Sequence, residues 1–201
     1  MTALLVAAEA ASPRFPLLTS LIAVPLVGAL IVGFIPRRQE PTLKTVGLLV
    51  ALATGVLSVF VAVQFKSGEA GFQMLTQHVW VKALGISWKL GVDGISLWLL
   101  VLTGVLFPIA LAGPAVHRDV KSYVIWMLVL EAACMGVFIA LDLLLFFLFF
   151  ELVLVPMYFL IAGWGYENRV YASLKFFLYT LFGSAFLLVG ILTLVFLTQR
   201  A

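Results

Sequence analysis

The sequence predicts an all-α integral membrane protein with six transmembrane helices. Of its 201 residues, 64% are hydrophobic and 10% are charged, whereas about 25% of the residues of an ordinary soluble domain are charged. Apolar runs long enough to cross roughly 30 Å of hydrocarbon recur along the chain. No alternating pattern of about ten residues recurs between turns, as a membrane β-barrel would require. These observations favour helices over strands as the spanning elements.

Each apolar run gives one predicted helix, and residues 1–201 are interpreted as a single membrane domain. The helices are expected at about residues 16–35, 43–65, 95–114, 121–140, 142–164 and 170–198. Short connections, namely PRRQEPT, AVHRD, the corner at Asp142 and GYENR, predict that consecutive helices are antiparallel neighbours. The longer link 66–94 mixes polar and aromatic residues, including Trp80 and Trp88. We expect it to lie over the membrane surface.

The basic residues indicate membrane topology and give no sign of a nucleic-acid partner. The formal net charge of +3 arises mainly from residues between the apolar runs, where Lys and Arg bias the orientation of a membrane protein. With the N-terminus outside, the inside connections hold Arg37, Arg38, Lys44, Arg118, Lys121 and Arg169, and the outside ones hold Arg14, Lys66, Lys82, Lys89 and Arg200. The denser clusters fall in the short inside links, so the N-terminus is predicted to lie outside.

Several kinds of site are not expected. The single cysteine, Cys134, lies inside an apolar run, which excludes an intrachain disulfide and a thiolate metal site. His78 and His117 fall in links, and the sequence has no metal-ligand cluster, glycine-rich phosphate loop or Ser/His/Asp set. Neither a nucleotide nor a redox cofactor is therefore expected to bind this chain. The first dozen residues lack the basic region of a secretory signal and are interpreted as a tail or as the start of the first helix.

Three ionisable residues, Glu131, Glu151 and Lys175, fall within predicted spans. A charge at the centre of a membrane helix costs roughly 2.5–3.5 kcal/mol on insertion scales, and such residues usually mark ion or proton pathways. Glu131 lies eleven residues before Asp142 and Glu151 lies nine after it. At 1.5 Å per residue both are about 14–17 Å from that corner. The two carboxylates are therefore predicted at similar depth near the middle of the membrane.

A glutamate at this depth is suited to loading and releasing a proton. In a dry environment a carboxylic acid prefers its protonated form, and a nearby cation favours the charged form. A lysine that moves relative to Glu151 would therefore switch its protonation. The alternative is a neutral acid that holds a neighbouring helix by a hydrogen bond. Pro156, five residues after Glu151, frees a carbonyl near Leu152 that could hold a water close to the acid.

Lys175 is the one cation inside a predicted span, and two interpretations remain open for it. It comes early in the last helix, so its long stem could carry the ammonium group to the nearby interface. Alternatively, it belongs to a proton path. Counted from the GYENR turn, Lys175 lies about 12 Å nearer the surface than Glu151, so the two side chains are expected to communicate through water and not by direct contact.

Three blocks of sequence resemble one family of respiratory membrane proteins. The blocks are GVDGISLWL at 91–99, LDLLLFFLFFELVLVPMYFLIAGWG at 141–165 and NRVYASLKFFLYTLFGSAFLL at 168–188. In sequence and order they are similar to the N-terminal part of subunit M of proton-pumping NADH:quinone oxidoreductase, respiratory complex I, whose mitochondrial counterpart is chain 4. The resemblance runs from about residue 16 to the C-terminus.

The resemblance implies the first two fifths of a fourteen-helix antiporter-like subunit that translocates protons. Its partners would be the lipid bilayer and other membrane-arm subunits, including neighbouring antiporter-like ones. NADH, FMN, iron–sulfur clusters and quinone would be bound by other subunits of the enzyme, and this chain would hold no redox active site. The proton-loading glutamate of the family's fifth helix falls on Glu151, that of the fourth on Glu131, and a lysine of the sixth on Lys175.

Two further matters follow from the resemblance. The lysine of the seventh helix that pairs with the equivalent of Glu151 has no position here, so a fragment and a truncated or split gene both remain open. Multi-subunit cation/proton antiporters share this fold and the same acid, which makes a subunit of such an antiporter the alternative function. No import segment is evident, so the inner (plasma) membrane of a bacterium is the expected location.

Overall fold

The structure is a computed structural model that describes residues 16–68, 71–81, 86–113 and 118–198. Within these ranges six helices are long and apolar enough to cross a membrane. They are α2 (Leu17–Phe34), α3 (Glu40–Gln64), α4 (Gly94–Ala112), α5 (Val120–Ile139), α6 (Leu143–Trp164) and α7 (Arg169–Thr198). The predicted fold class is confirmed. The other helix ends lie within two residues of the predicted ones, but α3 begins three residues early, at Glu40 with Pro41 in its first turn, where a proline is well tolerated.

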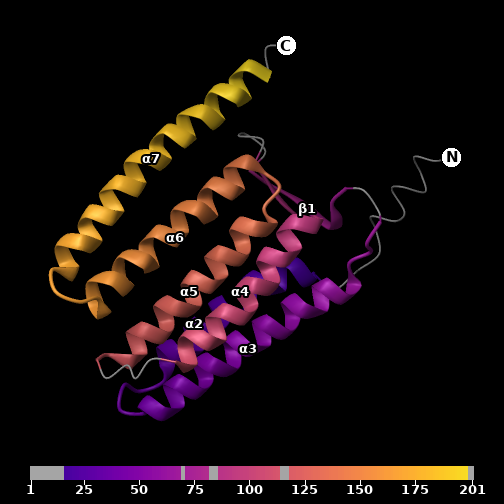
Figure 1. Cartoon of the computed structure of the whole chain (residues 1–201). Coiled ribbons are helices and arrows are strands. Elements are labelled where there is room, and N and C mark those ends of the chain that lie inside the picture. Colours follow the sequence, from indigo (N-terminus) through magenta and orange to yellow (C-terminus); the bar gives the residue numbers. More distant parts are fainter. Residues whose placement is uncertain (1–15, 69–70, 82–85, 114–117, 199–201) are drawn as a thin grey trace.

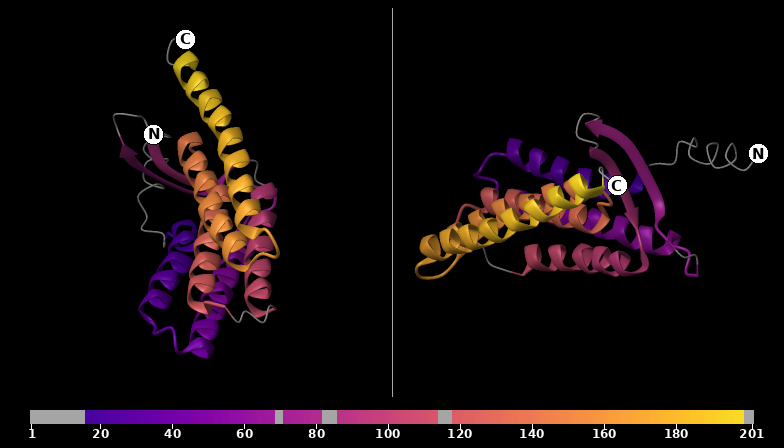
Figure 2. Two further views of the ribbon diagram at one scale, coloured as in Figure 1. Left: turned by 90° about the vertical axis from the view of Figure 1, so that its left-hand side faces the viewer. Right: turned by 90° about the horizontal axis from the view of Figure 1, so that it is seen from above.

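Helix α5 is the centre of the bundle. It packs against α2, α3, α4 and α6, and more than half of its membrane-length window is buried. Helix α7 packs mainly against α6 and lies along the outer side of the bundle (Figures 1 and 2). A residue of α5 can therefore be closed off from the surroundings on every side, whereas much of α7 is open.

Apolar side chains fill the bundle in two clusters, one toward each end. The first cluster joins Val61 near the end of α3 and Ile139 at the end of α5 to the starts of α2, α4 and α6. The second joins Leu43 of α3 and Val120 of α5, both near the starts of their helices, to the end of α2. Because α3 and α5 share both clusters in the same order, these two helices run parallel.

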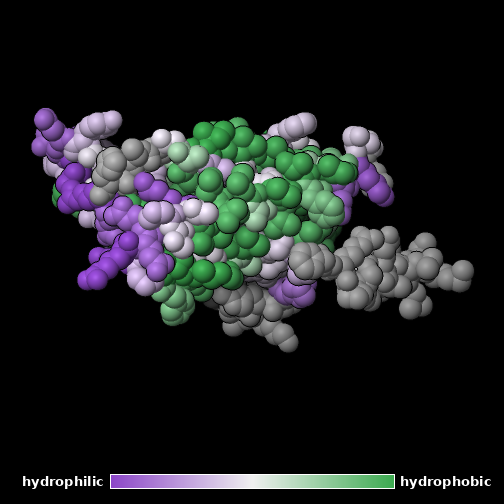
Figure 3. All heavy atoms as spheres, turned by 90° about the horizontal axis from the view of Figure 1, so that it is seen from below, coloured by the Kyte–Doolittle hydropathy of each residue, from purple (hydrophilic) through white to green (hydrophobic). Residues whose placement is uncertain are grey.

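Three short links lie together at one end of the bundle. Lys121 at the start of α5 donates a hydrogen bond to the carbonyl of Gly33 at the end of α2, at 2.6 Å. The Trp164 indole at the end of α6 donates to the carbonyl of Arg118, also at 2.6 Å, and Arg37 lies 3.9 Å from Asp119. Hydrophilic residues gather beyond a hydrophobic band along the helices (Figure 3). This pattern is typical of a protein that spans a bilayer.

The link 66–94 contains a β-hairpin that the sequence reasoning did not predict. Strand β1 (Gln73–Val81) pairs antiparallel with β2 (Ile86–Val92), and the hairpin crosses one end of the bundle (Figure 2). His78 lies opposite Trp88 in this hairpin. His117, Arg14, Lys82, Arg200 and the first dozen residues lie outside the described part of the chain, as does the side chain of Trp80.

The corner between α5 and α6 attaches the hairpin to the helices. One carboxylate oxygen of Asp142 accepts hydrogen bonds from the backbone N–H groups of Leu144 and Leu145, at 2.9 and 3.2 Å, and so caps α6. The other oxygen accepts from the backbone N–H and the hydroxyl of Ser87 in β2, at 3.0 and 3.2 Å. The backbone N–H of Leu141 donates to the carbonyl of Lys89. Asp142 thus fixes both the start of α6 and the position of the hairpin against the helices.

Close approach of α3 and α4 depends on small residues. A methyl group at Gly104 of α4 would meet the Ser58 hydroxyl and would come within 2.8 Å of the Gly55 Cα atom, both on α3. Small residues at such contacts let membrane helices approach closely and gain van der Waals contact. The α3–α4 pair therefore tolerates no side chain at Gly104 without a shift of the backbone.

We expect Asp142→Ala to lower the stability of the membrane domain. Loss of a helix cap alone costs about 0.5–2 kcal/mol, and the bonds to Ser87 are lost as well. Thermal unfolding in detergent measures the effect. Ser87→Ala is the matched control with a smaller expected loss, because its backbone N–H remains. An unfolding midpoint for Asp142→Ala equal to that of the unmodified protein would contradict this assignment.

We expect Gly104→Ala to destabilise the α3–α4 pair by about 1–3 kcal/mol, which is typical of an overpacked contact. Gly183→Ala on α7 is the control, since nothing lies within 4 Å of an added methyl group there. That control should unfold at an unchanged or higher temperature, because alanine favours a helix over glycine. Equal unfolding temperatures for the two variants would show that the close contact has no energetic weight.

Candidate functional site

Glu131 is a fully enclosed carboxyl group on the central helix α5. Its exposed fraction is 0%, and neither carboxyl oxygen has a hydrogen-bond partner among the described residues. Leaving a buried polar group unsatisfied costs about 1–3 kcal/mol, and more for a charged group. A buried glutamate at this position lowers the stability of the fold, and ionisable residues inside membrane helices usually have a functional role.

Glu151 lies in α6 and is only half-buried. Its Oε1 atom is buried without a hydrogen-bond partner in the described part of the chain. Tyr158 comes seven residues later, about two helical turns, and its ring contacts the Phe177 ring of α7 with centroids 5.6 Å apart. Glu151 therefore lies on the side of α6 that approaches α7.

The structure places the two acids at similar depth. Glu131 comes eight residues before Ile139, the last residue of α5, and Glu151 comes eight residues after Leu143, the first residue of α6. At 1.5 Å per residue each lies about 12 Å from the corner that joins the helices. Their common depth follows from the position of that corner.

The two acids nevertheless face different neighbours. Trp126 of α5 stacks on Phe159 of α6 with centroids 4.4 Å apart, which marks the side of α5 that faces α6. Glu131 comes five residues after Trp126 and so lies about 140° around the helix from it. No hydrogen bond joins Glu131 to Glu151 among the described residues. The spacing of the two glutamates from Asp142 in the sequence predicts their depth in the membrane. The direction of each side chain depends on which helices pack around it, and the spacing does not predict that.

Lys175 lies on the exposed side of α7. Its Nζ atom is 5.9 Å from the ring centroids of both Tyr171 and Tyr179, one turn before and one turn after it, which is within the range of a cation–π contact. Neither glutamate forms an ion pair with Lys175 in the part of the chain that the structure describes.

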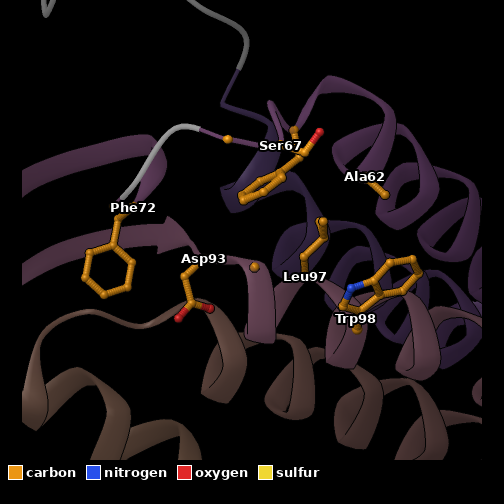
Figure 4. Close-up of a pocket in the computed structure, with 10 residues that line it drawn as sticks. Ala62, Ser67, Phe72, Asp93, Leu97 and Trp98 are labelled. Carbon is orange, nitrogen blue, oxygen red and sulfur yellow. The ribbon is translucent and has the colours of Figure 1, made fainter.

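A separate pocket of about 690 Å³ lies at the hairpin end of the bundle. Its walls include Phe72, Leu97 and Trp98 beside Asp93 (Figure 4). The backbone N–H of Ser96 donates to the Asp93 carboxylate at 2.7 Å, and the Ser96 hydroxyl accepts from the backbone N–H of Asp93. The backbone N–H of Ser96, and after it the Ser96 side chain, hold the pKa of the Asp93 carboxyl group below its ordinary value by hydrogen bonding. Asp93 thus serves as the N-cap of α4, a capping box that the DGIS sequence could have revealed.

Metal-ligating residues do not gather in the described ranges, where no group of three His, Cys, Asp or Glu could hold an ion. Cys134 is a free cysteine on α5 and is partly buried. In the middle of the described membrane helices the carboxyl groups are those of Glu131 and Glu151. Protonation and deprotonation of carboxyl groups is the chemistry that they can perform without a cofactor.

Known proteins resemble this chain in sequence. Residues 140–200 match a family described as NADH:quinone oxidoreductase/Mrp antiporter, TM. The chain is 37% identical over 186 residues to NADH-quinone oxidoreductase subunit M of Rickettsia bellii, which covers 89% of this chain and 38% of the relative. It is 41% identical over 184 residues to NADH-ubiquinone oxidoreductase chain 4 of Arabidopsis thaliana, which covers 90% of this chain and 37% of the relative. The chain thus spans less than two fifths of the length of these relatives.

The fold agrees as well. A chain in the structure of respiratory complex I from Thermus thermophilus with bound NADH superposes with a TM-score of 0.73 at 24% identity, over 87% of this chain and 36% of the other. The resemblance predicted from the sequence is confirmed by the family match, by the relatives and by the shared fold.

Proposed function

We propose that this chain, which belongs to the family of NADH:quinone oxidoreductase and Mrp antiporter transmembrane subunits, forms the N-terminal part of a proton-translocating subunit M. The observation that carries the proposal is the fully buried carboxyl group of Glu131 on the central helix, with Glu151 at similar depth on the next one. In a chain similar to subunit M over nearly its whole length, such acids are suited to proton transfer.

Glu151 is the proposed proton-loading group. Its side chain is half-buried on the side of α6 that approaches α7, so groups that exchange its proton are proposed to reach it from that side. Glu131 is proposed as a second proton site, enclosed by the bundle. Lys175 is proposed to take part from the outer side of α7, where its ammonium group lies between two tyrosine rings and is open to a further helix.

The proposal assigns the redox chemistry to other subunits. Proton transfer at Glu131 and Glu151 needs no bound cofactor, whereas NADH oxidation and quinone reduction need FMN, iron–sulfur clusters and a quinone site. The proposed partners are neighbouring membrane-arm subunits of the enzyme, including antiporter-like ones, and the lipid bilayer, which the exposed apolar residues of the outer helices would contact (Figure 3).

Bacterial relatives such as that of Rickettsia bellii support a location in the bacterial inner membrane, and the N-terminus is proposed to lie outside. The basic residues Arg37, Lys121 and Arg169 belong to the end of the bundle that gathers the short links, and basic residues favour the inside. A protease site inserted into the α6–α7 link should therefore be cut in inside-out vesicles and protected in intact spheroplasts. The reverse pattern would contradict the orientation.

A subunit of a multi-subunit cation/proton antiporter is the second candidate, because the matched family also includes Mrp antiporters. Purification of the chain from its native membrane separates the two. Co-purification with NADH-oxidising and iron–sulfur subunits supports the respiratory enzyme. Recovery with small antiporter subunits and sodium-dependent growth would support the antiporter instead.

We expect Glu151→Gln in the full-length subunit to abolish coupled proton pumping, because an amide cannot release a proton. Pumping is measured by the quenching of a pH-sensitive dye in vesicles supplied with NADH. Glu167→Gln is the matched control, since Glu167 is exposed in the link between α6 and α7 and should pump normally. Normal pumping and a normal quinone reductase rate in Glu151→Gln would refute the proton-loading role.

A further inference from the structure

The interface between α3 and α5 brings a buried hydroxyl group to the level of Glu131. Gly47 of α3 packs against Val124 of α5, since a methyl group at Gly47 would meet the Val124 side chain. The two helices run parallel, as their shared apolar clusters require. The residues that lie seven positions, or about two turns, after Gly47 and after Val124 are therefore again at the same height along the two helices. Those positions are Thr54 and Glu131.

Thr54 and Glu131 are equally closed off, with exposed fractions of 0% each. Side chains on a helix lean toward its N-terminus, and because α3 and α5 run parallel, both lean in the same direction and remain level. The Thr54 hydroxyl donates to the carbonyl of Val50 at 3.1 Å, which leaves its oxygen free to accept a hydrogen bond. The carboxyl oxygens of Glu131 have no partner among the described residues.

Buried polar groups in native proteins are almost always satisfied, either by another polar group or by an ordered water. We propose that the α3–α5 interface contains a buried water-binding site, formed by the carboxyl group of Glu131 and the hydroxyl group of Thr54. The water donates one hydrogen bond to the Thr54 oxygen and one to the Glu131 carbonyl oxygen, and it accepts from the protonated carboxyl. These partners are as many as a buried water usually has.

Ser58, one turn further along α3, provides the comparison. It is also buried, at 0% exposure, and its hydroxyl also donates to its own helix, at the carbonyl of Gly55. However, a methyl group at Gly104 would meet the Ser58 hydroxyl, so Ser58 faces α4. Burial and a hydroxyl group alone therefore do not make the site. The level along α3 distinguishes Thr54, because Ser58 lies four residues, about 6 Å, further along the helix.

The role of this site in proton transfer rests on the function proposed above, whereas the site itself does not. In that role the water would accept the hydrogen bond of the protonated Glu131 carboxyl group. Thr54 would be a positioning residue, because it would hold the water and would not exchange the proton itself. Normal pumping in Glu131→Gln would remove Glu131 from the proposed function and leave the binding of water to be judged by spectroscopy.

Infrared difference spectroscopy of the full-length subunit in lipid vesicles tests the site. The band lost in Glu131→Gln identifies the carboxyl group, and an O–D stretch that shifts when D₂¹⁶O is replaced by D₂¹⁸O identifies the water. Thr54→Val keeps the shape of the side chain and should abolish the water band and shift the carboxyl band to higher wavenumber. Thr54→Ser should retain both bands.

Ser58→Ala is the matched control and should leave both bands unchanged. The proposal is overturned if Thr54→Val leaves the water band and the Glu131 band unaltered, or if Ser58→Ala alters them equally. It is also overturned if no band sensitive to the oxygen isotope disappears in Glu131→Gln. Thermal unfolding of each variant confirms that the compared proteins are folded.

Discussion

The carboxylate of Asp142 sets the geometry on which the rest of this bundle depends. Its two oxygens accept four hydrogen bonds, two from the first turn of α6 and two from Ser87 of the hairpin. The chain therefore turns at a fixed point between Ile139 and Leu143. The depths of Glu131 and Glu151 follow from that point, since helical rise leaves no freedom once the ends are fixed.

Depth alone does not make the two acids one site. On α5, Glu131 comes two turns after Val124, which packs against Gly47 of α3, whereas the stacking of Trp126 on Phe159 marks the side of α5 that faces α6. Glu151 lies on the side of α6 that approaches α7. The bundle thus presents one enclosed carboxyl group and one that is half-buried.

Much of the fold follows from the sequence because the bilayer imposes a simple rule. Backbone groups in hydrocarbon must be satisfied within the segment, so apolar runs of sufficient length become helices, as all six did. The hairpin was missed, although Ile86, Trp88, Leu90 and Val92 alternate with Ser87, Lys89 and Gly91 in β2, the pattern of a strand with one buried face. The proposed relation between Glu131 and Thr54 could not be found from the sequence, because 77 positions separate them and only the parallel packing of α3 and α5 brings them to the same level.

The most direct test of this account is the infrared band of the Glu131 carboxyl group in the full-length subunit carrying Glu151→Gln. If the two acids occupy separate environments on different helix faces, that band keeps the position and intensity that it has in the unmodified protein. A shift of the Glu131 band when Glu151 is replaced would show that the carboxyl groups interact directly, and it would contradict the separation described above.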